Sequence, residues 1–551
     1  MALIINREKL LHRLEIFIIV FLACVPLAVT FPYRVNIFIS WEGAYRMSQG
    51  QLPFRDFGVP LGGMYWVIPA LFFKLFGPQM VTLVKAQVFI NILSGLAFRS
   101  ILGSLSVDKG ARFAAVLLFC MSYSFFNFWP WYNHTVIVYE LIALAFVLRY
   151  IRVGAQPYSF LLLFAAGIFM CFSFLTKQDG GGMAFLIGCM LLGYYGVMEK
   201  KWKPLLLFMG AFAVVLALIV LAFAGHGFGY WFNHGQPPHT ARISAFDIAD
   251  EFFGASQWLK FYLFIILLLT MLRYRSIKLL LADRNEFLLL LLTAAILGEA
   301  AIFQVTSYTP PDNNIFFHSF AFVYILTVLF KLFPASFGRT SVIVVGTAGV
   351  LLWWSGTYWK YMERIVNRAL PHNESVRAAG GENMVNRKTY MINRDTLEIP
   401  MDKWVESGLP SFKKIYMPPL TVAGIHRLLD MDLVKSHRGQ LKVLNMSELT
   451  PLAVEIPYAP ERNSQLPLWY HLGVCMFNKQ ADTLEARIGK HYYDLVLFEN
   501  IPTLNNFFPF RTRDSLRLHY RLADSFMAPR RGDTKGEIEV YIPMADSLSV
   551  R

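Results

Sequence analysis

Residues 41–76 read WEGAYRMSQGQLPFRDFGVPLGGMYWVIPALFFKLF and lie between two long apolar runs. A connection of this length between membrane spans is usually either functional or disordered. Disorder is not expected, because the segment is rich in Trp, Tyr and Phe and has few flexible polar runs. Two carboxylates, Glu42 and Asp56, stand in this amphipathic setting beside the membrane. This combination predicts acid/base chemistry on a lipid-linked substrate.

The composition is that of a membrane protein with a soluble part attached. The chain has 551 residues, of which 56% are hydrophobic and only 16% charged, and its mean hydropathy is +0.44. Soluble domains carry about 25% charged residues. The net charge of +14 is distributed as membrane topology requires, so nucleic acid is not an expected partner. The five cysteines form neither a disulfide framework nor a Cys/His cluster that would predict a metal site.

Eleven apolar runs are expected to cross the lipid bilayer. Each is near the ~20 residues that a bilayer core requires, and they cover roughly 16–39, 79–102, 111–129, 135–150, 158–175, 181–198, 204–224, 257–272, 287–306, 315–333 and 340–358. The first run is longer than a signal peptide needs, and we interpret it as an uncleaved helix. Lys and Arg concentrate in alternate connections, which predicts a cytoplasmic N-terminus. The loop 40–78 then lies outside, as does everything after the last run.

The polar end of the chain is expected to form a separate domain. We place the membrane domain at residues 1–359 and a soluble extracytoplasmic α/β domain at 360–551, which is long enough for its own core. Strand-like runs occur at 442–444, 493–498 and 537–542, and a helix-like run at 480–489. The predicted fold class is therefore an α-helical polytopic membrane protein of about 11 transmembrane helices with a C-terminal extracytoplasmic α/β domain.

Several motifs of the outer face occur in an order that is typical of one family. They are Trp41-Glu42-Gly43, the run Gly50-Gln51-Leu52-Pro53-Phe54-Arg55-Asp56 with Pro60, an amphipathic helix from Tyr65 to Gly77, Leu175-Thr176-Lys177, and His318 at the start of the tenth span. With a soluble domain after the last span, the first 360 or so residues resemble the GT-C glycosyltransferases. The similarity is to the bacterial branch that contains the protein mannosyltransferases and the aminoarabinose transferase of lipid A.

This resemblance implies a reaction at the outer face of a bacterial inner membrane. A sugar would pass from a polyprenyl-phosphate donor to a cell-envelope acceptor, with an acidic residue of the first outer loop as base on the acceptor hydroxyl. Such chemistry needs a carboxylate of suitable pKa and fixed cations on the phosphate. The family shows Asp-Glu at its opening motif, and Trp41 stands here at the Asp position. Either Glu42 or Asp56 has taken the role of base, or activity is lost.

The candidate substrate-binding residues each have a structural alternative. Lys177 precedes three glycines and a helix N-terminus, an arrangement that suits a phosphate, although a solvated turn is the alternative. For Lys85 the alternative is a lysine whose side chain reaches toward the membrane interface. For Arg55 the alternative is a local ion pair with Asp56. His318, His134 and Tyr65 complete the candidates for binding substrate. The histidines His226, His234 and His239 match no standard ligand spacing, so no metal ligands are predicted, and the need for a divalent cation is left undecided.

Two rival functions remain. A transporter or flippase of lipid-linked sugars would show paired inverted halves and ionisable residues deep in several spans. Glu140 and Glu299 are the main deep carboxylates, and we expect them to be structural or to lie near a span end. A catalytically inactive scaffold of the same fold is the second rival, and Trp41 is its best support. A polymerase or ligase of envelope glycans would differ mainly in its acceptor. The sugar, the acceptor and the oligomeric state are not predicted.

Overall fold

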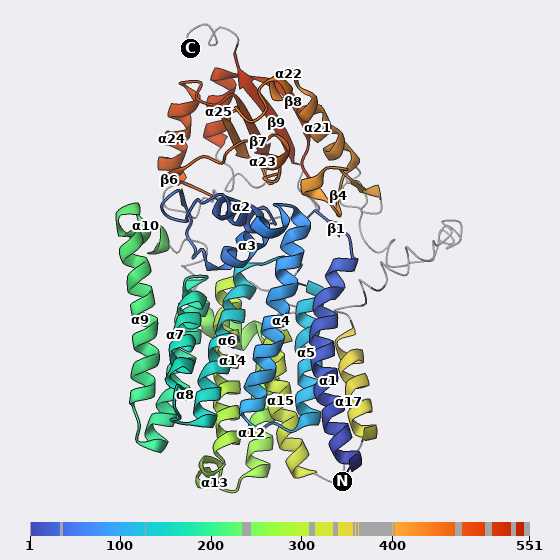
Figure 1. Ribbon diagram of the computed structural model, residues 1–551, viewed down its shortest axis with the longest axis vertical. Coiled ribbons are helices and arrows are strands. Elements are labelled where there is room, and N and C mark those ends of the chain that lie inside the picture. The colour runs from blue at the N-terminus through green and yellow to red at the C-terminus, as the bar shows by residue number, and fades with distance from the viewer. Residues whose placement is uncertain are drawn as a thin grey trace, which may run out of the picture.

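A bundle of long helices forms the larger part of the molecule in the computed structural model (Figure 1). The structure describes residues 2–33, 37–126, 128–233, 244–307, 315–333, 340–355, 359, 362, 399, 403–468, 477–501, 510–529 and 536–544. The bundle helices are α1 (Ala2–Cys24), α4 (Met80–Ser104), α5 (Lys109–Phe126), α6 (Tyr132–Val153), α7 (Phe160–Phe174), α8 (Gln178–Glu199), α9 (Lys203–Phe223), α12 (Gln257–Arg273), α14 (Arg284–Ser307), α15 (Ile315–Leu332) and α17 (Thr340–Trp353). Each overlaps one of the expected apolar runs, so the multi-pass helical architecture is confirmed.

The bundle helices differ in length and hydropathy. Within the described ranges, five helices are long and apolar enough to cross a membrane by themselves. The number rises to six if the bent pair Ala245–Gly254 and Gln257–Arg273 is counted as one span. Shorter apolar helices include Phe160–Phe174 and Phe316–Leu332. Several outward-facing apolar side chains on α9, such as Leu206, Leu218 and Leu221, are exposed, as expected for a surface that lipid covers.

The first span differs from the expectation. Helix α1 ends at Cys24 and is followed by the 3₁₀ turn η1 (Val25–Ala28) and the short strand β1 (Phe31–Pro32). Pro26 lies in the first turn of η1, where its ring and its missing N–H interrupt the helical hydrogen bonds. Residues 37–39 therefore do not extend the first span. They begin α2 (Ile37–Ser48), a separate helix of the outer loop.

The outer loop forms a layer between the bundle and the C-terminal domain (Figure 1). It contains α2, β2 (Phe57–Gly58), η2 (Met64–Trp66) and α3 (Val67–Phe76). Two glycines in left-handed backbone end its helices: Gly50 follows α2 and Gly77 follows α3, each with φ near +82°. The layer is buried on both sides, because Trp41, Tyr65 and Trp66 have no exposed surface.

The C-terminal domain is built on a four-stranded sheet in the order β5-β7-β9-β8. Strands β5 (Val443–Met446) and β7 (Leu495–Asn500) are parallel, whereas β9 (Glu537–Pro543) is antiparallel to both β7 and β8 (Tyr520–Met527). The helices of the domain are α21 (Pro419–Asp430), α22 (Asp432–Ser436), α23 (Leu452–Glu455), α24 (Phe477–Ile488) and α25 (Phe510–His519). The expected α/β organisation is confirmed. The expected boundary at 359/360 adjoins residues that lie outside the described part of the chain.

Strand pairing connects the membrane part to the C-terminal domain. Strand β1 pairs in parallel with β4 (Ile415–Met417), which also pairs with β3 (Val405–Glu406). Strand β2 of the outer loop pairs in parallel with β6 (Asn463–Pro467). The hydroxyl of Tyr33 also donates to the carbonyl of Glu448. The outer layer is thus bound to the bundle below it and to the domain above it, and this fixes the position of the candidate site.

Candidate functional site between the outer loop and the C-terminal domain

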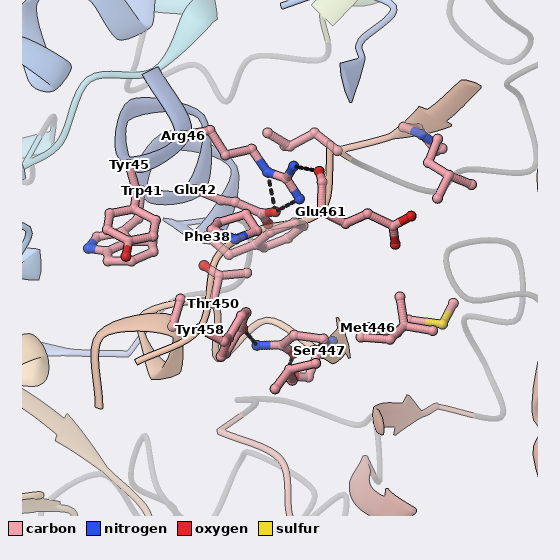
Figure 2. A pocket seen from close by; sticks show the side chains of 18 of the residues that line it. Phe38, Trp41, Glu42, Tyr45, Arg46, Met446, Ser447, Thr450, Tyr458 and Glu461 are labelled. Atoms are coloured by element: carbon pink, nitrogen blue, oxygen red, sulfur yellow. Dashed lines mark hydrogen bonds and ion pairs between the residues drawn. The ribbon is translucent and has the colours of Figure 1, made fainter. Parts of the chain in front are cut away.

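One face of α2 forms a wall of a pocket beneath the C-terminal domain (Figure 2). The side chains at positions 38, 41, 42, 45 and 46 follow the spacing that places residues on one side of a helix. The opposite wall comes from the domain and includes Asn445, Ser447, Thr450, Tyr458 and Glu461. The pocket therefore combines aromatic surfaces with a few hydrogen-bonding groups, which is the usual composition of a small-molecule site.

Glu42 and Arg46 form an ion pair on the α2 wall. The guanidinium of Arg46 lies 2.7 Å from Oε1 of Glu42, one helical turn away. Both side chains are largely buried, with 14% of Glu42 and 12% of Arg46 exposed. Burial raises the pKa of the Glu42 carboxyl, and the charge and hydrogen bond of Arg46 offset part of this rise. A carboxyl whose pKa is moved toward neutrality is suited to accept a proton from a substrate hydroxyl.

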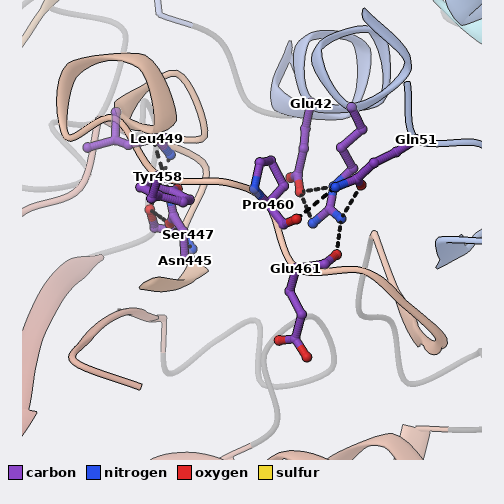
Figure 3. Close-up of polar contacts among 9 residues, drawn as sticks. Glu42, Gln51, Asn445, Ser447, Leu449, Tyr458, Pro460 and Glu461 are labelled. Carbon is purple, nitrogen blue, oxygen red and sulfur yellow. Dashed lines mark hydrogen bonds and ion pairs between the residues drawn. The ribbon is translucent and has the colours of Figure 1, made fainter. Parts of the chain in front are cut away.

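Backbone carbonyls of the C-terminal domain hold this wall in place (Figure 3). Arg46 donates to the carbonyl of Glu461 at 2.8 Å, and Nε2 of Gln51 donates to the carbonyl of Pro460 at 2.7 Å. Arg46 also donates to Oε1 of Gln51 at 3.2 Å. The guanidinium thus joins Glu42, the outer loop and the domain, and its orientation is fixed by several acceptors at once.

Asp56 occupies a tight turn at the edge of the same interface. Its carboxylate accepts from the N–H of Leu52 at 2.8 Å and pairs with Arg55 at 2.5 Å, and its own carbonyl accepts from the N–H of Asn463 at 2.7 Å. Burial acts to raise the pKa of Asp56, but the hydrogen bonds from Arg55 and Leu52, with the charges of Arg55 and Arg462, outweigh it and hold the pKa below its usual value. A carboxylate held in this way stabilises a turn and is a weaker base than Glu42.

Trp41 is packed into the layer. It is fully buried, stacks on Tyr45 with ring centroids 4.7 Å apart, and donates from its indole N–H to the carbonyl of Pro78 at 3.2 Å. On the other side of α2, Gly43 lies against Trp66, because a Cβ on Gly43 would be 2.0 Å from that ring. The position at which the sequence resemblance predicted an Asp thus carries a packing residue here.

A second polar group lies on the membrane side of the outer loop. Nζ of Lys177 pairs with Asp179 at 2.8 Å and lies 4.4 Å from the ring centroid of Phe303. Tyr65 is buried in η2 and packs edge-on against Tyr132 at 5.9 Å. The main chain of the loop reaches this group directly, since the N–H of Met64 donates to the carbonyl of Leu175.

The remaining predicted site residues lie apart from both groups. Lys85 projects from α4 over the ring of Phe76 at 4.7 Å. His318 on α15 contacts Tyr262 at 3.1 Å and stacks on Trp258, in an apolar groove between α5, α12, α15 and α17. His134 lies in the first turn of α6, and neither of its ring nitrogens has a hydrogen-bond partner among the described residues.

The structure divides the predicted site residues instead of collecting them. Glu42 lines the pocket under the C-terminal domain and Asp56 bonds to Asn463 of that domain, with Arg55 paired to Asp56. Lys177 and Tyr65 instead contact side chains of the bundle, at Phe303 and Tyr132. Arg46 and Tyr458 were missed by sequence reasoning. The spacing of Glu42 and Arg46 on one helix was a usable signal for the first, but Tyr458 is far away in sequence and had none. Asp179, two residues after Lys177, was visible in the sequence only as part of a polar turn.

Comparison with known proteins supports the architecture. No family model matches the chain, and neither does any curated protein. The structure of ArnT from Cupriavidus metallidurans in the apo state matches over 96% of this chain and 97% of that one, at 12% identity and a TM-score of 0.51. The chain has the GT-C fold. At this identity the likeness shows the fold alone.

Two further solved structures match less closely. ArnT from the same organism bound to undecaprenyl phosphate covers 96% of this chain and 97% of that one, at 12% identity and a TM-score of 0.45. The oligosaccharyltransferase of Archaeoglobus fulgidus in complex with Zn and sulfate aligns at 13% identity and a TM-score of 0.38, over 66% of this chain and 56% of that one. This chain therefore spans little more than half the length of the archaeal protein.

The described residues were also compared with the groupings that hold metal ions. No group of three or more His, Cys, Asp or Glu residues that could hold a metal ion occurs in the described part of the chain. Two of the loop histidines considered from the sequence, His234 and His239, lie outside the residues that the structure describes.

Proposed function

We propose that this chain is a membrane glycosyltransferase that moves a sugar from a polyprenyl-phosphate donor to a cell-envelope acceptor. The observation that carries the proposal is the buried Glu42–Arg46 pair in the pocket between α2 and the C-terminal domain. The GT-C fold and the undecaprenyl phosphate bound to ArnT in its crystal structure support the choice of a lipid-linked donor. The inner membrane of a bacterium, with the C-terminal domain outside, is the proposed location.

Glu42 is the proposed general base. Burial raises the pKa of its carboxyl, so it can take the proton of an acceptor hydroxyl as that oxygen attacks the sugar. The sugar carbon then gains a bond to the acceptor oxygen and loses its bond to the phosphate oxygen, which leaves with the electron pair. Arg46 supplies a fixed cation in the same pocket for charge that develops during transfer. Asp56 has the supporting role of holding the turn that carries Arg55.

Lys177 and Tyr65 are proposed to serve the donor. They lie on the membrane side of the outer loop, where the phosphate of a lipid carrier arrives from the bilayer. A buried ammonium group attracts such a phosphate strongly because little water screens it. The C-terminal domain, which forms half of the Glu42 pocket, is proposed to recognise the acceptor.

The test is sugar transfer in proteoliposomes from a panel of polyprenyl-phosphate donors. Glu42→Gln removes the base at nearly constant volume, and we expect a loss of about 10²–10⁴-fold in turnover with donor binding retained. Asp56→Asn should reduce turnover less, because its role is local. Asp430→Asn is the matched control, since Asp430 is an exposed carboxylate of the domain that pairs with Lys435.

Each negative outcome points to a different rival. A wild-type protein that transfers no sugar from the panel but moves lipid-linked sugars across the bilayer would be a flippase. A protein that does neither, yet binds envelope components, would be the inactive scaffold that Trp41 favours. If transfer occurs and Glu42→Gln matches the wild type, the transferase stands and the base is elsewhere.

A further inference from the structure

Two carboxyl groups lie deep in the helix bundle, outside the site proposed above. Glu140 on α6 and Glu299 on α14 are 1% and 3% exposed. Their side chains lie against each other across the two helices. None of their four carboxyl oxygens is open to solvent, and no described residue directs a hydrogen-bond donor at them. Buried polar groups without partners are rare and call for an explanation.

The pair lies below a row of polar and apolar side chains that descends from the outer loop along two helices. On α6 this row follows Tyr132, Val136 and Glu140 at four-residue intervals, and on the antiparallel α14 it follows Thr306, Phe303 and Glu299, so that one apolar residue on each helix separates the carboxyl from the polar residue above it. The start of α8 lies between them, since a Cβ on Gly180 would be 3.1 Å from Val136 and 3.2 Å from Phe303. Lys177 and Asp179, the charged groups that act on Glu299, lie beside Phe303, between the pair and the outer loop.

Electrostatic repulsion decides which protonation states of Glu140 and Glu299 are possible. Two ionised carboxylates in contact repel each other, and in a low-dielectric interior no water relieves the repulsion. Lys177 attracts one negative charge at this depth, but it is already paired with Asp179 and does not balance two more. A protonated carboxyl beside an ionised one makes a strong O–H···O⁻ hydrogen bond and satisfies both groups at once.

We propose that Glu140 and Glu299 share a single proton and form an intramembrane proton-binding site directly beneath the Lys177–Asp179 pair. The occupant is a proton because the four oxygens are closed to solvent and leave no access for a larger cation. The shared proton ties α6 to α14 and gives the pair a charge of minus one. Lys177 then has two anionic neighbours, Asp179 and the pair, which keep it charged. This inference does not depend on the transferase activity.

Infrared difference spectroscopy of the purified full chain in nanodiscs tests the proposal. At neutral pH the wild type should show the carbonyl band of a protonated carboxyl that is slow to exchange with deuterium. In Glu140→Gln and in Glu299→Gln the remaining carboxyl should ionise, because it gains an amide donor and keeps Lys177. The band should therefore disappear completely in each single variant. Glu286→Gln, at a buried carboxyl that is paired with Lys331, is the matched control and should keep the band.

Other results overturn the shared proton. A wild type without the band would mean that both carboxyls are ionised. A band that falls by half in each variant would mean that each carboxyl carries its own proton.

Thermal unfolding against pH gives a second test on the same samples. The native pair holds a proton that the unfolded chain releases above about pH 4.3, so wild-type stability should fall as the pH rises beyond that value. The double variant Glu140→Gln/Glu299→Gln should lack this fall, and an identical decline in both proteins contradicts the proposal.

Discussion

At the scale of single residues, the two candidate carboxylates of the outer loop have opposite surroundings. Sequence reasoning selected both Glu42 and Asp56, because two carboxylates in an amphipathic segment beside a membrane suggest acid/base chemistry, but it left their roles unassigned. The structure separates them: burial raises the pKa of Glu42, and local donors lower that of Asp56. This difference depends on Arg46, the Leu52 N–H and the domain that covers α2. The first two contacts are local in the chain, but a sequence pattern cannot give the cover by the domain, which is about four hundred residues away in sequence.

The pH dependence of transfer should follow Arg46. Since Glu42 must be ionised to act as base, kcat/KM should rise with pH through the pKa of its carboxyl. Arg46→Met removes the charge that offsets burial, so the pKa should rise further and the acid limb should move upward by roughly 1–3 pH units. Arg55→Met is the control, because Arg55 pairs with Asp56. An acid limb that stays in place in Arg46→Met would show that Glu42 does not control it.

Asp56 should contribute to stability in a pH-dependent way. Its folded-state pKa is lowered, so its stabilising effect is present above the pKa of the unfolded chain and is lost as the pH falls through the folded value. Asp56→Asn should therefore lower Tm at neutral pH, corresponding to about 1–2 kcal/mol, near the lower end for charged hydrogen bonds because Arg55 is partly exposed. Melting curves of both proteins should converge in acid. A constant difference at every pH would contradict this role.

At the scale of elements, the apolar runs predicted the bundle well and the outer loop less well. Long runs of apolar residues are unambiguous, and all eleven correspond to a helix. The first run was extended too far because Ile37–Ile39 are as apolar as a span, although Pro26 already ends the helical hydrogen bonding. The strands at 443–446, 495–500 and 537–543 followed from their apolar patterns. Strands of two residues, such as β1 and β2, carry no periodic signal and were not foreseen.

The contact between the outer loop and the α7–α8 turn depends on one glycine. A Cβ on Gly62 would lie 1.4 Å from the carbonyl oxygen of Leu175, so Gly62→Ala must move the loop away from this turn. We expect faster hydrogen exchange at the amide of Met64, which donates to the same carbonyl, and weaker donor binding near Lys177. Gly193→Ala, which has open space around it on α8, should leave both unchanged. Unaltered exchange in Gly62→Ala would show that the loop does not depend on this contact.

At the scale of the whole molecule, the C-terminal domain is part of the site. The pocket around Glu42 has one wall on α2 and the other on the domain, and β1 and β2 each pair with a strand of the domain. Separation of the two parts would therefore open the pocket and expose the Glu42–Arg46 pair. The domain lies at the end of the bundle opposite the N-terminus (Figure 1), and sequence reasoning could not show that it closes the site.

Loss of the contacts across this junction should loosen the domain. Gln51→Ala together with Tyr33→Phe removes two side-chain bonds to carbonyls of the domain, at Pro460 and Glu448. We expect hydrogen exchange to accelerate in β6 and turnover to fall, since Arg46 loses its ordered surroundings. Lys435→Ala is the control, because its ion pair with Asp430 is exposed and contributes little. If exchange in β6 is unchanged in the double variant, strand pairing alone holds the domain.

The pairing of β4 and β6 with strands of the membrane part limits how the protein can be divided. In a secreted fragment that starts after the last span, the edges of β4 and β6 that face β1 and β2 would present unpaired N–H and C=O groups. Open strand edges of this kind recruit strands from other chains. Such a fragment should therefore self-associate during expression. Co-production of the two pieces from separate genes should rescue it, because the membrane piece supplies the missing strands during assembly.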